Sequence, residues 1–240
     1  MSVLSDIHFC TFGSSDTYTA ALNRIERQAI ASKYFDSITC YTEKNTPGLD
    51  QHKNFIEKNK KGYGYWIWKP LVILATMKKA RENDVIVYAD AGCFIHSTTE
   101  AKRKFAEYMS LVKKTAPHRL SFQLDHPEEN YTKTDVLELL NIANTEHATT
   151  GQFAGTYQIL LNNDENRALV EEWHRIMTYD NHRYHDDTPS RSPNATTFKA
   201  ARHDQSVISC LMKARGTIPL PDPYPPKNTD PISPVRSRKA

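Results

Sequence analysis

Asp90 lies where α/β proteins usually carry their chemistry. It follows the apolar run Val85–Tyr88 within DVIVYADAGC (84–93), and Ala91 and Gly92 come next. A carboxylate at a strand end beside a glycine either forms an ordinary turn or binds a divalent cation at the carboxyl edge of a sheet, where open α/β folds hold ligands. Magnesium and manganese prefer oxygen ligands and often bridge substrate phosphates. The local pattern alone favours neither interpretation.

A second group of ligand-type side chains stands in RHDQS (202–206). His203, Asp204 and Gln205 are consecutive and lie at the start of an expected helix. A helix N-cap explains an aspartate at this position without any further role. It does not explain the neighbours of Asp204. The block therefore indicates a site only in combination with Asp90.

The segment GYGYWIWKP (62–70) is unusually aromatic and ends in a lysine and a proline. It predicts either a core plug with a glycine turn or a loop that packs on a ligand ring. In the second case the glycines let the backbone approach the ligand, and Lys69 offers a cation to a phosphate. No phosphate-binding GxxxxGK[ST] loop occurs, and neither does HExxH, GxSxG or GxGxxG.

The elements that must position these residues begin with a β-α-β unit. Ile7–Phe12 reads as a strand, Ser14–Asp16 starts a helix that runs to about Ser32, and Ser37–Thr42 reads as a second strand. Doubly wound α/β folds open in this way. Further along, the sequence predicts helices over 71–81, 99–114 and 135–143, strands over 119–124 and 151–161, and helices beginning near 164 and 204.

The segment after Leu220 differs from the rest of the chain because it is rich in proline and ends in basic residues. This composition predicts a disordered segment or an extended arm on the surface. We therefore expect one domain over residues 1–220 and a Pro-rich, partly disordered tail over residues 221–240.

Composition and charge narrow the class of protein. A net charge of +3 over 240 residues is weak support for nucleic-acid binding, although it suits a diffuse attraction to anionic substrates and peripheral contact with membranes. The four cysteines form no CxxC pair, which indicates a reducing compartment. There is no signal-peptide pattern, and no run approaches the roughly 18 apolar residues of a membrane span. We expect a soluble cytoplasmic protein.

Four blocks taken in order carry a family resemblance. GYGYWIWKP, DVIVYADAGC, TGQFAG (150–155) and RHDQS resemble small GT-A-fold glycosyltransferases of bacterial polysaccharide clusters and large DNA viruses, over about residues 7–216. The resemblance implies a single Rossmann-like α/β domain with a mixed central sheet flanked by helices. It also implies transfer of a sugar from a nucleotide-diphosphate donor to a glycan or lipid-linked glycan acceptor.

The resemblance also assigns residues. In this family an Asp-x-Asp motif holds a divalent metal, here Mn²⁺ or Mg²⁺, on the donor diphosphate. Asp90 matches the first acid, but Gly92 stands in place of the second, so either the metal has fewer protein ligands or the enzyme needs none. His203 is then a supplementary metal ligand, and Asp204 with Gln205 acts in catalysis or holds sugar hydroxyls.

The remaining expected contacts follow from the same resemblance and from the rule that ligands sit at strand carboxyl ends. Asp90 and Lys69 are expected to neutralise the leaving diphosphate. The expected donor-binding residues are Thr11, Phe12, Glu43, Tyr65, Trp66, Lys69, Asp90, Ala91 and Gly92, and the expected acceptor or sugar contacts are Gly151 and Gln152.

Two other function classes stay open. A non-catalytic nucleotide- or glycan-binding protein on the same fold would bind a donor without the slow donor hydrolysis expected of a transferase. A different α/β enzyme, such as a methyltransferase or a nucleotidyltransferase, usually carries several glycines in the loop after its first strand. Here the corresponding TFGSSD has only Gly13.

Overall fold

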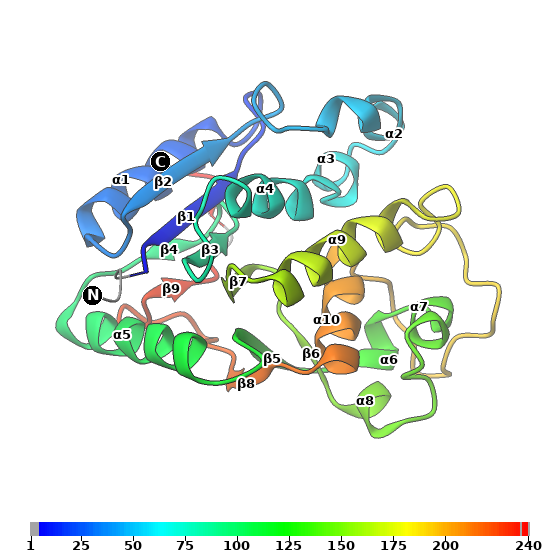
Figure 1. Ribbon diagram of the computed structural model, residues 1–240. Helices are drawn as coiled ribbons and strands as arrows, with labels where there is room; N and C mark the ends of the chain where they lie inside the picture. Colours follow the sequence, from blue (N-terminus) through cyan, green and yellow to red (C-terminus); the bar gives the residue numbers. More distant parts are fainter. Residues whose placement is uncertain (1–4, 236, 240) are drawn as a thin grey trace.

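The computed structural model describes residues 5–235 and 237–239, and its described part is built on a mixed seven-stranded sheet (Figure 1). Along the sheet the order is β2-β1-β3-β7-β5-β6, and β8 pairs with β5. The strands are β1 (Ile7–Phe12), β2 (Ser37–Tyr41), β3 (Val85–Ala89), β5 (Arg119–Pro127), β6 (Gly151–Phe153), β7 (Tyr157–Leu161) and β8 (Ile218–Pro221).

The sheet is parallel at one side and mostly antiparallel at the other. β1 pairs in parallel with both β2 and β3, whereas β7 is antiparallel to β3 and β5. The carboxyl ends of β1, β2 and β3 therefore meet at one edge of the sheet. The expected β-α-β opening is confirmed, with α1 (Thr19–Ser32) between the first two strands.

Helices cover both faces of the sheet, because successive strand residues point to opposite sides. In β3, Ile86 and Tyr88 pack with α4 (Trp68–Met77), α9 (Asp164–Thr178) and α10 (Asp204–Arg215). Val85 and Val87 pack with α1 and α5 (Thr99–Lys114) on the other face. The mixed central sheet flanked by helices is thus confirmed, and the short helices α6 (Glu128–Tyr131), α7 (Thr134–Leu139) and α8 (Glu146–Thr149) lie near β6.

Several predicted bounds are wrong. The single strand expected over 151–161 is two strands, since β6 pairs with β5 and β7 leaves it to pair with β3. The helix expected over 135–143 ends at Leu139, and the helix expected from 71 begins at Trp68. The polar stretch before residue 62 contains a short 3₁₀ helix, η1 (Leu49–His52), and α2 (Lys53–Lys58).

The GYGYW segment forms a left-handed turn that includes α3 (Gly62–Tyr65). Five consecutive residues have positive φ, with values of 57°, 55°, 81°, 51° and 62° from Gly62 to Trp66. Left-handed backbone costs an ordinary L-residue about 1–2 kcal/mol. The two glycines adopt this conformation at little cost, so the conformational cost falls on Tyr63, Tyr65 and Trp66.

The tail does not extend away from the domain. β9 (Ile232–Ser233) pairs with β4 (Phe94–Ile95), and both residues of β9 are buried. The described part of the tail is extended and packs back against the domain through β9 (Figure 1). Within the described residues, no helix combines the length and the apolar character needed to cross a bilayer.

Candidate active site

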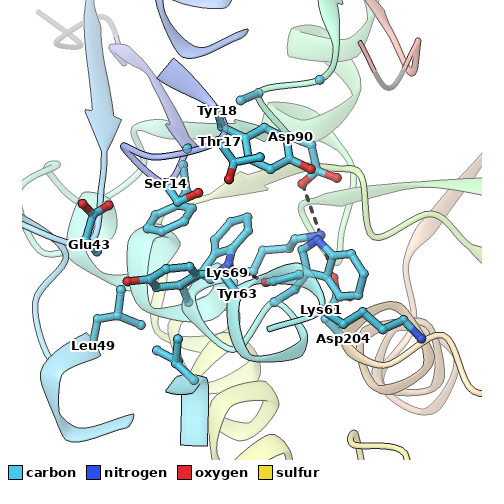
Figure 2. Close-up of a pocket in the computed structure, with 18 of the residues that line it drawn as sticks. Ser14, Thr17, Tyr18, Glu43, Leu49, Lys61, Tyr63, Lys69, Asp90 and Asp204 are labelled. Carbon is cyan, nitrogen blue, oxygen red and sulfur yellow. Dashed lines mark hydrogen bonds and ion pairs between the residues drawn. The ribbon is translucent and has the colours of Figure 1, made fainter. Parts of the chain in front are cut away.

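A cleft of about 1200 Å³ opens where β1 and β3 end (Figure 2). Its volume suits a ligand larger than a single sugar, since most small-molecule sites enclose about 300–1,000 Å³. All four sequence blocks contribute to its lining: residues 62–63, 66 and 68–69 from the first, 90–93 from the second, 155 from the third, and 202 and 204–205 from the fourth. The fold therefore brings together segments that are far apart in sequence.

Three charged side chains meet at the floor of this cleft. The ammonium Nζ of Lys69 lies 3.2 Å from Asp90 Oδ1 and 2.6 Å from Asp204 Oδ2, and it donates a hydrogen bond to the Gly155 carbonyl at 3.0 Å. The approach to Asp204 is an ion pair without hydrogen-bond alignment. Three oxygens thus surround the ammonium that we expected to offer a cation to a phosphate, and Lys69 is almost fully buried.

Burial sets the charge state of this cluster. Burial disfavours the Lys69 ammonium, but Asp204 and Asp90 outweigh this effect and raise its pKa. Burial also raises the pKa of Asp204 to about 6; Lys69 opposes this rise and Asp90 adds to it. With both carboxylates ionised the cluster carries one net negative charge. The Asp90 side chain is 29% exposed, against 6% for Asp204, so Asp90 presents that charge to the cleft.

Aromatic rings form one wall of the cleft. The Phe12 ring stacks on Trp68 with 4.1 Å between centroids, and Tyr63 lies 5.9 Å from Phe12. Trp66 also lines the cleft. Tyr65 lies elsewhere: it is buried, its hydroxyl donates to Asp187 at 2.7 Å, and it does not line the cleft.

The loops after β1 and β2 form another wall. Glu43 lines the cleft and accepts a hydrogen bond from the Ser15 amide at 3.1 Å. Thr11, which we expected beside Phe12 and Glu43, is fully buried below the lining. The sequence reasoning missed Ser14, Asp16, Thr17 and Tyr18 as lining residues because it read this stretch as the start of a helix; the helix begins only at Thr19.

Most of the third block lies behind the cleft and supports residues that line it. Gln152 is fully buried and donates to Glu128 at 2.9 Å, and neither it nor Gly151 lines the cleft. Gln205 does line the cleft, but its amide nitrogen donates to Gln152 at 2.8 Å and its oxygen accepts from the Gly155 amide at 3.2 Å. The observed contacts of Gln205 therefore position the beginning of α10.

A metal at Asp90 would depend largely on substrate oxygens. Asp90 and His203 belong to no described group of three side-chain ligands close enough to share an ion. The His203 ring stacks on Tyr65, and its Nδ1 lies 2.7 Å from the His185 carbonyl. One carboxylate with substrate phosphates is nevertheless a common way to hold Mg²⁺. Asp90 fits that arrangement, and Ala91 and Gly92 beside it also line the cleft.

One other described cluster has metal-ligand character. Asp6 and Asp84 come directly before β1 and β3, and His8 is the second residue of β1, so the three lie at the edge of the sheet opposite the cleft. His8 Nε2 is 3.0 Å from Asp84, and Arg81 pairs with Asp6 at 2.7 Å and with Asp84 at 3.4 Å. The arginine already supplies a cation, so these contacts describe a structural ion-pair network.

No protein-family model matches the chain, and no curated protein does. Among solved structures, mouse xyloside xylosyltransferase 1 has a TM-score of 0.48 and 12% identity, with 90% of this chain and 84% of that chain covered. A glycosyltransferase involved in glycosylation of the major capsid of PBCV-1 has a TM-score of 0.47 and 9% identity, with 97% of this chain and 95% of that chain covered. The galactosyltransferase LgtC, in complex with donor and acceptor sugar analogs, has a TM-score of 0.43 and 11% identity, with 88% of this chain and 72% of that chain covered.

Proposed function

We propose that this chain is a glycosyltransferase that moves a sugar from a nucleotide-diphosphate donor to a hydroxyl of a glycan acceptor. The observation that carries the proposal is the cleft floor, where Asp90, Lys69 and Asp204 from three separate blocks meet at 3.2 Å or less. These are the blocks on which the family resemblance rests. A purely structural ion-pair cluster would have no reason to line a cleft of about 1200 Å³.

The lining suggests how a donor lies. The aromatic wall of Phe12, Tyr63 and Trp66 offers flat apolar surface for a base, and Glu43 offers carboxylate oxygens for ribose hydroxyls. The diphosphate then lies near the Asp90–Gly92 turn, since ligands sit at strand carboxyl ends in such sheets.

The charge of the floor requires a cation beside that diphosphate. Two carboxylates and one ammonium leave a net negative charge, which opposes a phosphate anion. Asp90, the more exposed acid, would hold Mg²⁺ or Mn²⁺ together with the diphosphate oxygens. When bound, the ion supplies neutralisation of charge on the leaving group.

Asp204 has the properties of a group that handles a proton or a sugar hydroxyl. A pKa of about 6 leaves it ionised at neutral pH yet basic enough to accept a proton from a hydroxyl as the bond to the sugar forms. Lys69 holds the two carboxylates in place. Gln205 supports the same helix start through Gln152.

Donor hydrolysis in the absence of an acceptor tests the proposal. Purified protein is incubated with a panel of uridine, guanosine and thymidine diphosphate sugars, with Mn²⁺, with Mg²⁺ or with a chelator. We expect slow release of nucleotide from one donor and loss of at least about 10²-fold in Asp204→Asn. Glu57→Gln, at a carboxylate that lines the cleft away from its floor, is the matched control.

Two results would count against the enzyme. Equal rates of donor hydrolysis by wild type and Asp204→Asn would show that Asp204 has only a structural role at the start of its helix. Binding of a donor without any hydrolysis would favour the non-catalytic nucleotide- or glycan-binding protein.

A further inference from the structure

The C-terminal arm closes back over the turn that carries Asp90. The amide of Ser237 donates a hydrogen bond to the Gly92 carbonyl at 3.0 Å. The β4–β9 pairing fixes the arm just before this point, with Phe94 opposite Ser233. The arm and the Asp90 turn are therefore joined by backbone contacts at two successive places.

A buried arginine connects the same two segments. The guanidinium of Arg24, from α1, donates to the carbonyls of Ala91 at 2.8 Å and Cys93 at 3.1 Å, and also to the Ser237 carbonyl at 3.3 Å. Arg24 is 4% exposed, and in the described part of the chain no carboxylate forms an ion pair with it. Its two terminal NH2 groups donate to backbone carbonyls, which suits a residue that fixes the course of the arm.

This docking places Arg238 at the cleft. Its guanidinium carbon lies 5.2 Å from the centre of the Tyr18 ring, and both residues line the cleft together with Gly92. Tyr18 and Asp90 are both among the side chains that line the cleft (Figure 2). Arg238 is exposed, and no described carboxylate pairs with it.

Four of the other cleft cations contact protein groups, whereas Lys60 is exposed among the lining residues. Lys69 is surrounded by three oxygens at the floor, Lys61 lies 3.9 Å from Asp187, and Lys53 lies 3.9 Å from Glu57. Arg202 sits over the Tyr131 ring at 4.1 Å. A diphosphate entering the cleft would therefore meet a floor with net negative charge, beside a guanidinium held at the edge by the arm.

We propose that the arm, described over residues 231–235 and 237–239, is a strap that delivers Arg238 to the diphosphate of the bound donor. The planar fork of a guanidinium binds phosphate oxygens in pairs, which adds direction as well as charge. The strap deepens the proposed function and rests on it, because it gives the leaving group a protein cation in addition to any metal.

Titration calorimetry with inorganic pyrophosphate, without divalent metal, tests the strap on the full chain. Arg238→Ala should weaken binding by about tenfold or more, which corresponds to about 1.4 kcal/mol. Lys239→Ala is the matched control: it removes the same charge from the adjacent residue, which does not line the cleft, and should change affinity by less than about twofold. Arg238→Lys should recover part of the loss.

A charge-neutral variant separates placement from charge. Ser237→Pro removes the amide that bonds to Gly92 and leaves Arg238 in the chain. If the strap delivers the arginine, this variant should weaken pyrophosphate binding about as much as Arg238→Ala does. Circular dichroism and an unchanged melting temperature confirm that each variant is folded.

Three results would overturn the strap: no pyrophosphate binding by wild type, unchanged binding in Arg238→Ala, or equal losses in Arg238→Ala and Lys239→Ala. If the proposed function fails but the strap holds, the wild type does not hydrolyse any donor, while Arg238→Ala still binds pyrophosphate more weakly than the wild type does. Failure of the strap alone leaves donor hydrolysis sensitive to Asp204→Asn and pyrophosphate binding insensitive to Arg238.

Discussion

The charge states of Lys69 and Asp204 depend on each other and on the nearby Asp90. The two carboxylates keep the buried ammonium protonated, and the ammonium limits how far burial raises the pKa of Asp204. A buried charged group without such partners would shift its pKa and become neutral. Removing any one of the three charges therefore changes the pKa of Lys69, of Asp204 or of both.

The pH dependence of turnover should report on Asp204. With a pKa of about 6, raised by burial, the carboxylate is ionised above that pH and protonated below it. If the ionised form is the active one, kcat/KM for the donor should fall about tenfold per pH unit below the pKa. Steady-state assays between pH 5 and 8.5 measure this dependence, with samples returned from pH 5 to pH 7.5 as the control for unfolding.

A flat profile down to pH 5, with the protein still folded, would show that the ionised carboxylate is not required. A fall that does not recover at pH 7.5 would report unfolding and leave the profile to be measured at shorter exposure.

Lys69→Met should destabilise the fold as well as the site. It leaves two carboxylates near each other, one of them almost fully buried, and breaking a buried pair in this way typically costs about 3–5 kcal/mol. The double variant Lys69→Met with Asp204→Asn removes the stranded charge, so urea unfolding should show recovery of a large part of that loss. Additive losses would mean that the two side chains are not coupled.

The left-handed turn over residues 62–66 shapes the aromatic wall. Its backbone carries Tyr63 and Trp66 to the cleft and turns Tyr65 to Asp187 and His203. Strained backbone of this kind persists only where the surroundings hold it. Ile56 of α2 packs against Gly64, so α2 and the turn support each other.

Gly64→Ala should disrupt this turn. Gly64 has φ of +81°, and a Cβ there would lie 2.7 Å from Ile56 Cγ1. Gly48→Ala is the matched control, because φ is +79° but the nearest atom would be 3.8 Å away. We expect a loss of about 1 kcal/mol for Gly48→Ala and a larger loss, with weaker donor binding, for Gly64→Ala. Urea unfolding and calorimetry compare them; equal losses would show that the contact with Ile56 relaxes easily.

Histidines join distant parts of the whole molecule. His52 Nε2 lies 3.1 Å from His174 Nε2, which links η1 to α9, and His182 stacks on Phe55 of α2 at 3.8 Å. His185 is fully buried nearby. Burial lowers the pKa of His52 to about 4 and that of His185 to about 3, and neighbouring histidines lower both further.

Acid should therefore destabilise the protein through this cluster. A histidine takes up a proton near pH 6.5 when unfolded, whereas folded His185 does so only near pH 3, so stability is retained above about 6.5 and lost as the pH falls below it. Fully buried His185 should account for a loss of about 2 kcal/mol in the free energy of unfolding as the pH falls from 6.5 to 5. Melting temperatures of wild type, His185→Phe and the control His147→Gln measure this. The same acid slope in all three would rule out His185 as a source.

The sequence by itself determined the elements whose signals are local. The apolar run before Asp90, the β-α-β opening and the helical periodicity of α5 and α9 were predictable because a residue's neighbours along the chain set its side-chain direction. The order of the four blocks also indicated a shared site, and at least one residue from each block lines the same cleft.

Only the tertiary structure decided which side chains face that cleft. Lys69 is buried between two acids, Gln152 supports Gln205 from below, and the arm brings Arg238 to the edge; each depends on contacts between segments far apart in the chain. The left-handed turn at 62–66 is likewise held by packing, since the local preference of its three aromatic residues is against it. Long-range contacts have no periodic signature in the sequence, so the elements were predictable while the partners of each charge were not.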